Sequence, residues 1–221
     1  MWLTYLSLIS SVIGIFVCFS DNGHPYIGSM CLLLSGLCDA FDGKVARTDR
    51  NRTERQKRYG VQIDSLSDLV AFGVLPACIG AAMFRSTVGF GAPISSIMSE
   101  LPYEIYVAVF CVYVLAALVR LAWFNVSVEE TPAVPGVRQN FTGLPVTSAA
   151  LIFPTFLLLR WYLLPPDIGI GYFAVMLITA ALFVGRFNVR KPGLRGVLIM
   201  VGIGLVEFIL LLLIRLLRVK G

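Results

Sequence analysis

Long apolar runs alternate with short polar segments along nearly the whole chain. A membrane-spanning helix needs about 20 mainly apolar residues, and the runs have about this length. Helices pair all their backbone groups internally, as a bilayer requires, and we find no alternating pattern typical of barrel strands. We therefore expect spans near residues 2–19, 26–43, 65–85, 102–124, 144–163, 168–185 and 195–217.

The composition also indicates a membrane protein without a separate soluble domain. Of 221 residues, 57% are hydrophobic and 14% are charged, whereas soluble domains average about 25% charged residues. We predict an all-α, polytopic transmembrane helix bundle of about 6–8 spans, forming a single transmembrane domain over residues 1–221. The run 2–19 lacks a basic start and a small-residue cleavage site, so we interpret it as a retained span with no tail before it.

The basic residues predict an orientation in the membrane. The segments 43–60, 125–143 and 186–195 hold 12 of the 18 Lys and Arg residues, and they share one face if the spans alternate. Basic loops favour the cytoplasmic side. This face is therefore predicted to be cytoplasmic.

The C-terminal run conflicts with this scheme. An odd number of spans puts Arg215, Arg218 and Lys220 on the outer side, so either the run 195–217 is a tight re-entrant pair or the charge rule fails there. Glu207 lies within this run, where a lone acid is costly. It could pair with an arginine on another helix.

Four aspartates interrupt the apolar pattern at the predicted cytoplasmic face. Asp39 and Asp42 are spaced i, i+3, and Asp64 and Asp68 are spaced i, i+4, so each pair lies on one face of its own helix. Both helices flank the segment 43–60, and the four carboxylates can converge. Salt bridges to that segment would compensate their charge, but we favour bound Mg²⁺ or Mn²⁺, which take oxygen ligands and often sit on substrate phosphates.

Small residues and a cation follow the first pair. Gly43 and Ala46 would let a ligand approach the backbone closely, although taken alone they fit close helix packing better. Arg47 is a fixed cation suited to phosphate. Together with the aspartates, these residues describe a site for a metal-bound pyrophosphate.

The residues spell D-x2-D-G-x2-A-R followed by G-x3-D-x3-D, which resembles the signature of the CDP-alcohol phosphatidyltransferase family, D-x2-D-G-x2-A-R-x8-G-x3-D-x3-D. The chain departs from it in spacing, because 12 residues, 48–59, separate the two halves. The extra residues fall in the predicted cytoplasmic turn, where insertions are tolerated. All eight fixed positions match: Asp39, Asp42, Gly43, Ala46, Arg47, Gly60, Asp64 and Asp68.

Within the family, three segments resemble the membrane-embedded phosphatidylserine synthases of bacteria, and the resemblance covers roughly residues 1–150. They are QIDSLSDLVAFGVLPA at 62–77, LVRLAWFNV at 118–126 and FTGLPVTSAA at 141–150. Trp123 departs from this branch, in which an arginine is common at that position. Any anion contact made by that arginine would be absent or supplied by Arg120, Arg138 or a basic residue of 186–195.

The resemblance implies transfer of a phosphatidyl group from CDP-diacylglycerol to L-serine with release of CMP, by a homodimer. It implies that Asp68 deprotonates the acceptor hydroxyl. It also implies two divalent ions, Mg²⁺ or Mn²⁺, that bind the pyrophosphate and are held by Asp39, Asp42, Asp64 and Asp68. The CDP-binding residues that it implies are Asp39, Gly43, Ala46 and Arg47.

The carboxylate of serine calls for a cation near the site. Arg120 lies about one turn from the cytoplasmic end of its span, where an arginine is a candidate functional residue. An ion pair with a neighbouring acid, or snorkelling to the interface, would also explain it. Asn125 and Thr142 could complete the serine pocket. Thr4, near the start of the first span, could touch the nucleotide, or its hydroxyl could bond to its own helix.

Two other functions stay open. The aspartate motif does not separate serine from other acceptors, such as glycerol phosphate or inositol phosphate, or from serine transfer to an archaeal ether lipid. A divalent-cation channel or transporter also uses carboxylates, but it usually places them near the midplane with broken helices or a repeat, and we find no repeat.

The expected partners are CDP-diacylglycerol, L-serine, the product CMP and the lipid bilayer, with no nucleic acid. The expected location is the cell (plasma) membrane, with the active site facing the cytoplasm.

Overall fold

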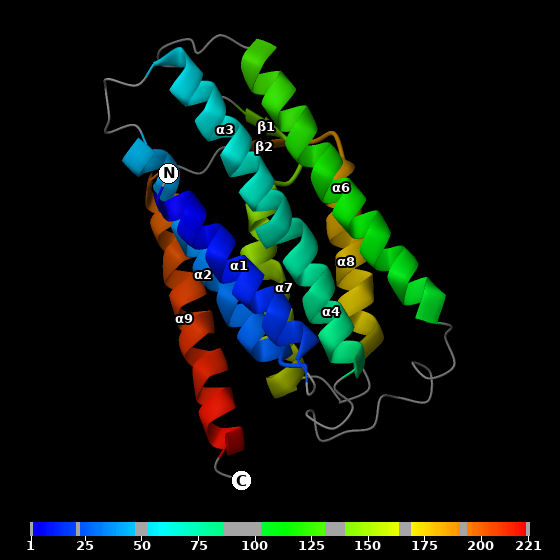
Figure 1. The fold of residues 1–221 in the computed structure, drawn as a ribbon. Coiled ribbons are helices and arrows are strands. Elements are labelled where there is room, and N and C mark those ends of the chain that lie inside the picture. The colour runs from blue at the N-terminus through cyan, green and yellow to red at the C-terminus, as the bar shows by residue number, and fades with distance from the viewer. Residues whose placement is uncertain are drawn as a thin grey trace.

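The chain folds into a bundle of helices (Figure 1). In this computed structural model, residues 2–20, 23–46, 53–85, 103–130, 140–163, 169–190 and 194–219 are described. The long helices are α1 (Trp2–Phe19), α2 (Pro25–Ala46), α3 (Glu54–Asp68), α4 (Leu75–Arg85), α6 (Tyr103–Glu130), α7 (Ala149–Leu163), α8 (Gly169–Val184) and α9 (Leu194–Val219). Two short helical segments, η1 (Leu69–Val74) and η2 (Val146–Ser148), and two strands, β1 (Asn140–Thr142) and β2 (Asn188–Arg190), join them. The predicted all-α membrane bundle is confirmed, with one small sheet that the sequence did not predict.

The outer surface of the bundle is apolar. In the described ranges, four helical stretches are long and apolar enough to cross a membrane, and two shorter apolar helices accompany them. Large side chains such as Phe16, Ile178 and Ile199 are 72%, 60% and 63% exposed. Water would not favour so extensive an apolar surface, so the chain is an integral membrane protein. The four long stretches are Trp2–Phe19, Glu54–Met83, Glu104–Ser127 and Arg195–Leu216.

Helices α1 and α2 form a hairpin through small side chains. The hydroxyls of Ser7 and Ser35 each donate to the carbonyl of the other residue, at 3.3 and 2.9 Å. Ser10 donates to the carbonyl of Cys31 at 3.0 Å. Small hydroxyl residues let membrane helices approach closely. The hairpin therefore holds the start of α1 beside the end of α2, where two of the aspartates lie.

The second aspartate-bearing helix is longer than predicted. Instead of starting near residue 65, α3 starts at Glu54, because Thr53 caps it. The Thr53 hydroxyl accepts from the Gln56 N–H at 3.3 Å, and the Gln56 side chain accepts from the Thr53 N–H at 3.0 Å. This capping box satisfies two backbone donors at once. The polar first turns of α3 are exposed.

Directly after Asp68 the helix continues through the π-helical segment η1 into α4. Pro76 has no N–H to donate to the carbonyl one turn before it. Instead, Tyr113 of α6 donates its hydroxyl to the Phe72 carbonyl at 2.7 Å. Tyr172 of α8 donates to the Pro76 carbonyl at 2.8 Å. These two buried tyrosines therefore tie α6 and α8 to the segment below Asp68.

A small sheet joins the segment before α7 to the segment after α8. Strands β1 and β2 pair antiparallel, with Phe141 opposite Val189. Next, the Gly143 N–H donates to the Phe187 carbonyl at 2.6 Å, and the Leu144 N–H donates to the Leu182 carbonyl at 3.1 Å. These bonds fix the chain entering η2 and α7 against the end of α8.

We expect Gly143→Ala to destabilise this end of the bundle by about 2 kcal/mol or more. Gly143 has φ +84°, and a Cβ there would lie 2.7 Å from the Gly185 carbonyl oxygen. Thermal unfolding of the purified protein in detergent measures the change. Gly202→Ala is the matched control, because nothing lies within 4 Å of a Cβ at that position of α9. An equal, small effect of both substitutions would contradict the expectation.

Helix α9 corrects two expectations. It is one continuous helix, so the proposed re-entrant pair is wrong. Figure 1 shows its end at the opposite end of the bundle from the start of α1. Arg215 therefore lies away from the basic face, against the charge rule. The expected arginine partner of Glu207 is also wrong, since the Glu207 carboxylate accepts a hydrogen bond from the Thr155 hydroxyl of α7.

Candidate active site

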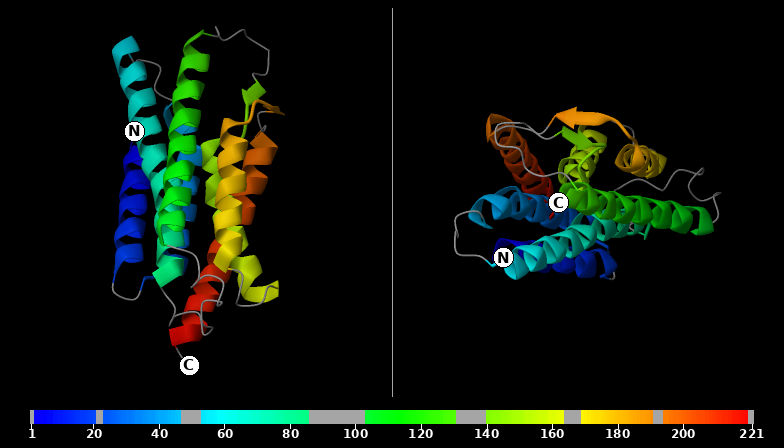
Figure 2. Two further views of the ribbon diagram at one scale, coloured as in Figure 1. Left: turned by 90° about the vertical axis from the view of Figure 1, so that its right-hand side faces the viewer. Right: turned by 90° about the horizontal axis from the view of Figure 1, so that it is seen from above.

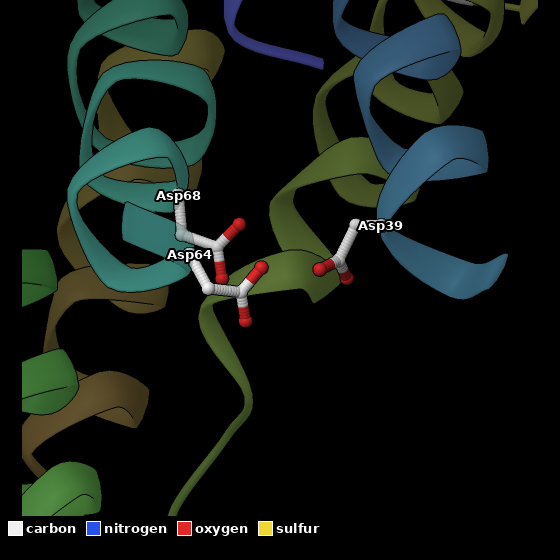
Figure 3. Close-up of side chains that lie close together, drawn as sticks. All are labelled: Asp39, Asp64 and Asp68. Carbon is white, nitrogen blue, oxygen red and sulfur yellow. The ribbon is translucent and has the colours of Figure 1, made fainter. Parts of the chain in front are cut away.

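Three aspartates converge where the end of α2 faces α3. One carboxylate oxygen from each of Asp39, Asp64 and Asp68 lies within 4.8 Å of the others. Figure 3 shows Asp39 pointing from α2 toward the two aspartates of α3, which lie one helical turn apart. The i, i+4 spacing puts both α3 carboxylates on the side that faces α2. The structure thus brings together three of the four aspartates named from the sequence.

Asp42, the fourth aspartate, lies at the edge of this cluster and is held by α1. Its side chain is buried, and Oδ2 accepts a hydrogen bond from the Thr4 hydroxyl at 3.2 Å. Asp42 also interacts directly with Asp64. The Ser67 hydroxyl donates to the Thr4 carbonyl at 3.2 Å and joins α3 to the same point. Thr4 therefore orients an aspartate instead of bonding to its own helix.

The cluster has the oxygen donors that hard divalent cations bind. Carboxylates this close repel one another unless positive charge lies near them. Over the residues that the structure describes, the sole salt bridge joins Lys57 to Glu54 on the exposed part of α3, so no described basic side chain neutralises the aspartates. The residues present therefore fit a divalent metal site. The basic residues Arg47, Arg50 and Arg52 lie outside the described residues.

Arg120 has a different partner from those considered in the sequence. It is only 4% exposed, and its Nε donates to the Leu144 carbonyl at 2.9 Å. Its guanidinium also lies 5.7 Å from the centre of the Phe124 ring. The contact with Leu144 was not foreseeable, because a backbone carbonyl carries no residue-specific signal. Arg120 helps to hold the segment that enters α7.

Asn125 lies on α6 next to the aspartate-bearing helix. Its side-chain amide donates to the Ser65 hydroxyl at 2.9 Å, and the Ser65 hydroxyl lies 3.2 Å from the amide oxygen of Asn125. Ser65 follows Asp64 directly in the chain. The pair therefore fixes α6 against α3 beside the cluster, and Ser65 is a site neighbour that sequence reasoning missed.

Trp123 is exposed and packs with a basic residue that follows α8. The Arg186 guanidinium lies 5.6 Å from the centre of the Trp123 ring, a typical cation–π geometry. Arg186 belongs to the segment 186–195 that was expected to offer a substitute cation. Arg138, which was also named as a substitute beside Arg120, lies outside the described residues.

The remaining residues named from the sequence are described only in part. Gly43 and Ala46 belong to the last turns of α2, and Thr142 ends β1. For these positions the structure describes the backbone elements but not the side-chain surroundings. Arg47 lies outside the described residues.

Comparison with known proteins relates this geometry to an enzyme family. The model of the family described as CDP-alcohol phosphatidyltransferase matches residues 1–187. The chain is similar to the CDP-diacylglycerol–serine O-phosphatidyltransferase of Saccharomyces cerevisiae, with 34% identity over 180 residues that cover 78% of this chain and 58% of the yeast protein. It is similar to the Helicobacter pylori protein of the same name, with 27% identity over 191 residues that cover 85% of this chain and 70% of that protein.

An archaeal protein is similar as well. The archaetidylserine synthase of Methanothermobacter thermautotrophicus is 32% identical over 160 residues, which cover 72% of this chain and 54% of that protein. The chain therefore spans less than two thirds of the yeast and archaeal proteins that it matches. In each case the matched part covers most of this chain.

Proposed function

Because the chain belongs to the CDP-alcohol phosphatidyltransferase family, we propose that it transfers a phosphatidyl group from CDP-diacylglycerol to L-serine and releases CMP. The observation that carries the proposal is the convergence of Asp39, Asp64 and Asp68 within 4.8 Å, at positions that match the family motif. The names of the yeast and Helicobacter pylori relatives support serine as the acceptor.

The aspartates would hold the divalent ions on which this family depends. Asp39, Asp64 and Asp68 offer one set of oxygens, and Asp42 lies against Asp64. This arrangement is compatible with two ions, Mg²⁺ or Mn²⁺. When bound, such ions supply positive charge to the pyrophosphate and to the leaving CMP.

The nucleotide half of the donor would lie against the last turns of α2. As small residues, Gly43 and Ala46 would leave room near the backbone, and Arg47 would contact phosphate. Asp39 and Thr4 complete the proposed CDP-binding set. The hydrogen bond from Thr4 to Asp42 supports an indirect role for Thr4, which is to keep that carboxylate aimed at the cluster.

Asp68 is the proposed general base. A serine hydroxyl is a weak nucleophile, so a base must accept its proton as the oxygen attacks phosphorus. The hydroxyl oxygen of serine forms the new bond to the lipid-bearing phosphorus, and the bond from that phosphorus to the bridging oxygen breaks. CMP leaves with that oxygen, and the proton passes to the Asp68 carboxylate.

The serine carboxylate would be bound by Arg120, with Asn125 and Thr142 nearby. The Arg120 Nε is occupied by Leu144, which leaves the N–H groups of the two terminal nitrogens for a carboxylate. The amide of Asn125 is paired with Ser65, so its contribution would be to position α3.

Arg120→Ala is expected to raise the KM for serine about 10- to 100-fold, the loss typical of a hydrogen bond to a charged group. The KM for CDP-diacylglycerol should change much less. Initial rates of CMP release, measured with each substrate varied in turn, give both values. If both rise equally, Arg120 serves only to hold the segment around Leu144, and its assignment to the carboxylate is wrong.

The basic segments favour a cytoplasmic active site in the cell membrane. Serine and cytidine nucleotides would then reach the aspartates from water, while the acyl chains stay in lipid beside the bundle. A homodimer is part of the same proposal, by analogy with the family.

The direct test incubates the purified protein with CDP-diacylglycerol, a divalent metal and a panel of alcohols. We expect CMP release with L-serine and little with glycerol phosphate or inositol phosphate. The similarity to an archaetidylserine synthase makes the ether-linked CDP-lipid the second donor to test. CMP release with a phosphorylated acceptor and none with serine would contradict the proposed acceptor.

A further inference from the structure

A pocket between α6 and the end of α8 has two arginines in its wall. Its volume is about 100 Å³, and its lining is Val119, Arg120, Trp123, Phe183, Val184, Gly185 and Arg186. The inner wall includes Arg120, which is 4% exposed, whereas Trp123 and Val184 at the outer side are each 54% exposed. The pocket therefore opens toward the outer surface of the bundle.

Neither arginine has an acidic partner among the residues that the structure describes. Arg120 bonds to a backbone carbonyl, and Arg186 lies over the ring of Trp123. Arg120 is buried whereas Arg186 is exposed, and burying a cation such as Arg120 without a counter-charge is costly. An anion that enters the pocket would supply the missing charge.

An apolar surface continues from the pocket along both helices. On α6, Leu115 and Val119 lie two turns and one turn before Trp123 and are 59% and 45% exposed. On α8, Ile178 and Leu182 precede the pocket with the same spacing and are 60% and 38% exposed. Figure 2 shows α6 and α8 running beside each other along the bundle. Positive charge at the polar end of an apolar, membrane-facing surface is the complement of an anionic phospholipid.

We propose that this pocket binds the phosphate head group of an anionic membrane phospholipid, with Arg186 as the outer contact and the acyl chains along the apolar stripes of α6 and α8. None of the four aspartates lines this pocket, but it shares Arg120 with the proposed serine site, so Arg186, which that site does not use, carries the lipid assignment. A small anion from water would share the chemistry of the head group, so the test must separate the two sources.

Trp123 serves as the reporter. The chain has three tryptophans, and the double variant W2F/W161F leaves Trp123 alone. This variant is reconstituted with phospholipids whose acyl chains carry bromine, which quenches tryptophan on contact, without CDP-diacylglycerol or serine. Brominated phosphatidylglycerol should compete about fivefold better for Trp123 than brominated phosphatidylcholine, the preference expected for one added cation near an anionic head group.

Arg186→Gln in this background should remove the preference, while Arg186→Lys should keep most of it. Arg195→Gln is the matched control, since it removes the same charge from α9, on the opposite side of the bundle from α6 and α8 (Figure 1). A preference that survives Arg186→Gln, or equal quenching by both lipids, would overturn the proposal. Loss of the preference in excess inorganic phosphate would show that the pocket takes a small anion, and the lipid assignment would be wrong. Because no transfer is measured, each result stands whether or not the protein is a transferase.

Discussion

Replacing Asp68 by asparagine is expected to lower the rate of CMP release by roughly a hundred- to ten-thousandfold, the usual contribution of a general base. Asparagine has the same shape but accepts no proton, so the acceptor hydroxyl would keep its hydrogen during attack. Binding of CDP-diacylglycerol should be partly retained, because Asp39, Asp42 and Asp64 remain. Single-turnover CMP release and equilibrium binding of the lipid to the purified variant measure the two effects separately.

Glu207→Gln provides the matched control for this substitution. It also changes a buried carboxylate to an amide, and the new side chain can still accept from Thr155. Glu207 lies on α9, outside the aspartate cluster, so this variant should turn over at nearly the normal rate. If Asp68→Asn retains the normal rate, Asp68 is not the base.

Removal of divalent metal should abolish turnover, and added Mg²⁺ or Mn²⁺ should restore it. Asp39→Asn should raise the metal concentration needed for half-maximal rate by at least about 100-fold, since loss of even an outer-shell partner commonly weakens metal sites 10- to 100-fold. The reason is that Asp39 is the one member of the three-aspartate cluster that α2 supplies. The electron paramagnetic resonance signal of free Mn²⁺, titrated with protein, measures binding without reference to catalysis.

Glu54→Gln is the control for general charge effects on Mn²⁺ binding. Glu54 is the exposed first residue of α3, the helix that carries Asp64 and Asp68, and its carboxylate pairs with Lys57 at 2.7 Å. Its loss should leave the Mn²⁺ titration unchanged. Full activity in chelator, or unaltered Mn²⁺ binding by Asp39→Asn, would show that the aspartates do not form a metal site.

The apolar pattern predicted the fold well because burial in lipid imposes a length and a composition on each helix. The run 2–19 coincides with α1, and the run 195–217 lies within α9. The prediction placed the start of α3 too late, because its first turns are exposed and stabilised by a capping box rather than by apolar burial. The sheet of β1 and β2 was missed because each strand has three residues and pairs with a segment far along the chain.

Within the candidate site, helical spacing was enough to group the aspartates but not to find their neighbours. Asp64 and Asp68 share a helix face by periodicity alone, whereas the bond between Asp42 and Thr4 depends on how α1 packs on α2. The same holds for Ser65 with Asn125 and for Arg120 with Leu144. Such contacts join separate helices, and one sequence carries no record of which helices touch.

The π-helical segment η1 sets the rotation of the aspartate-bearing helix α3 relative to α4. A π-turn holds one more residue than a regular turn, and this one lies between Asp68 and α4, which starts at Leu75. If the same residues formed a regular α-helix, the extra residue would no longer be absorbed, and α3 would rotate by about 100° relative to α4. Asp64 and Asp68 would then swing away from Asp39 while every aspartate stayed in the sequence. Whether the three aspartates converge therefore depends on the helical geometry of η1 as well as on the presence of the acids in the sequence.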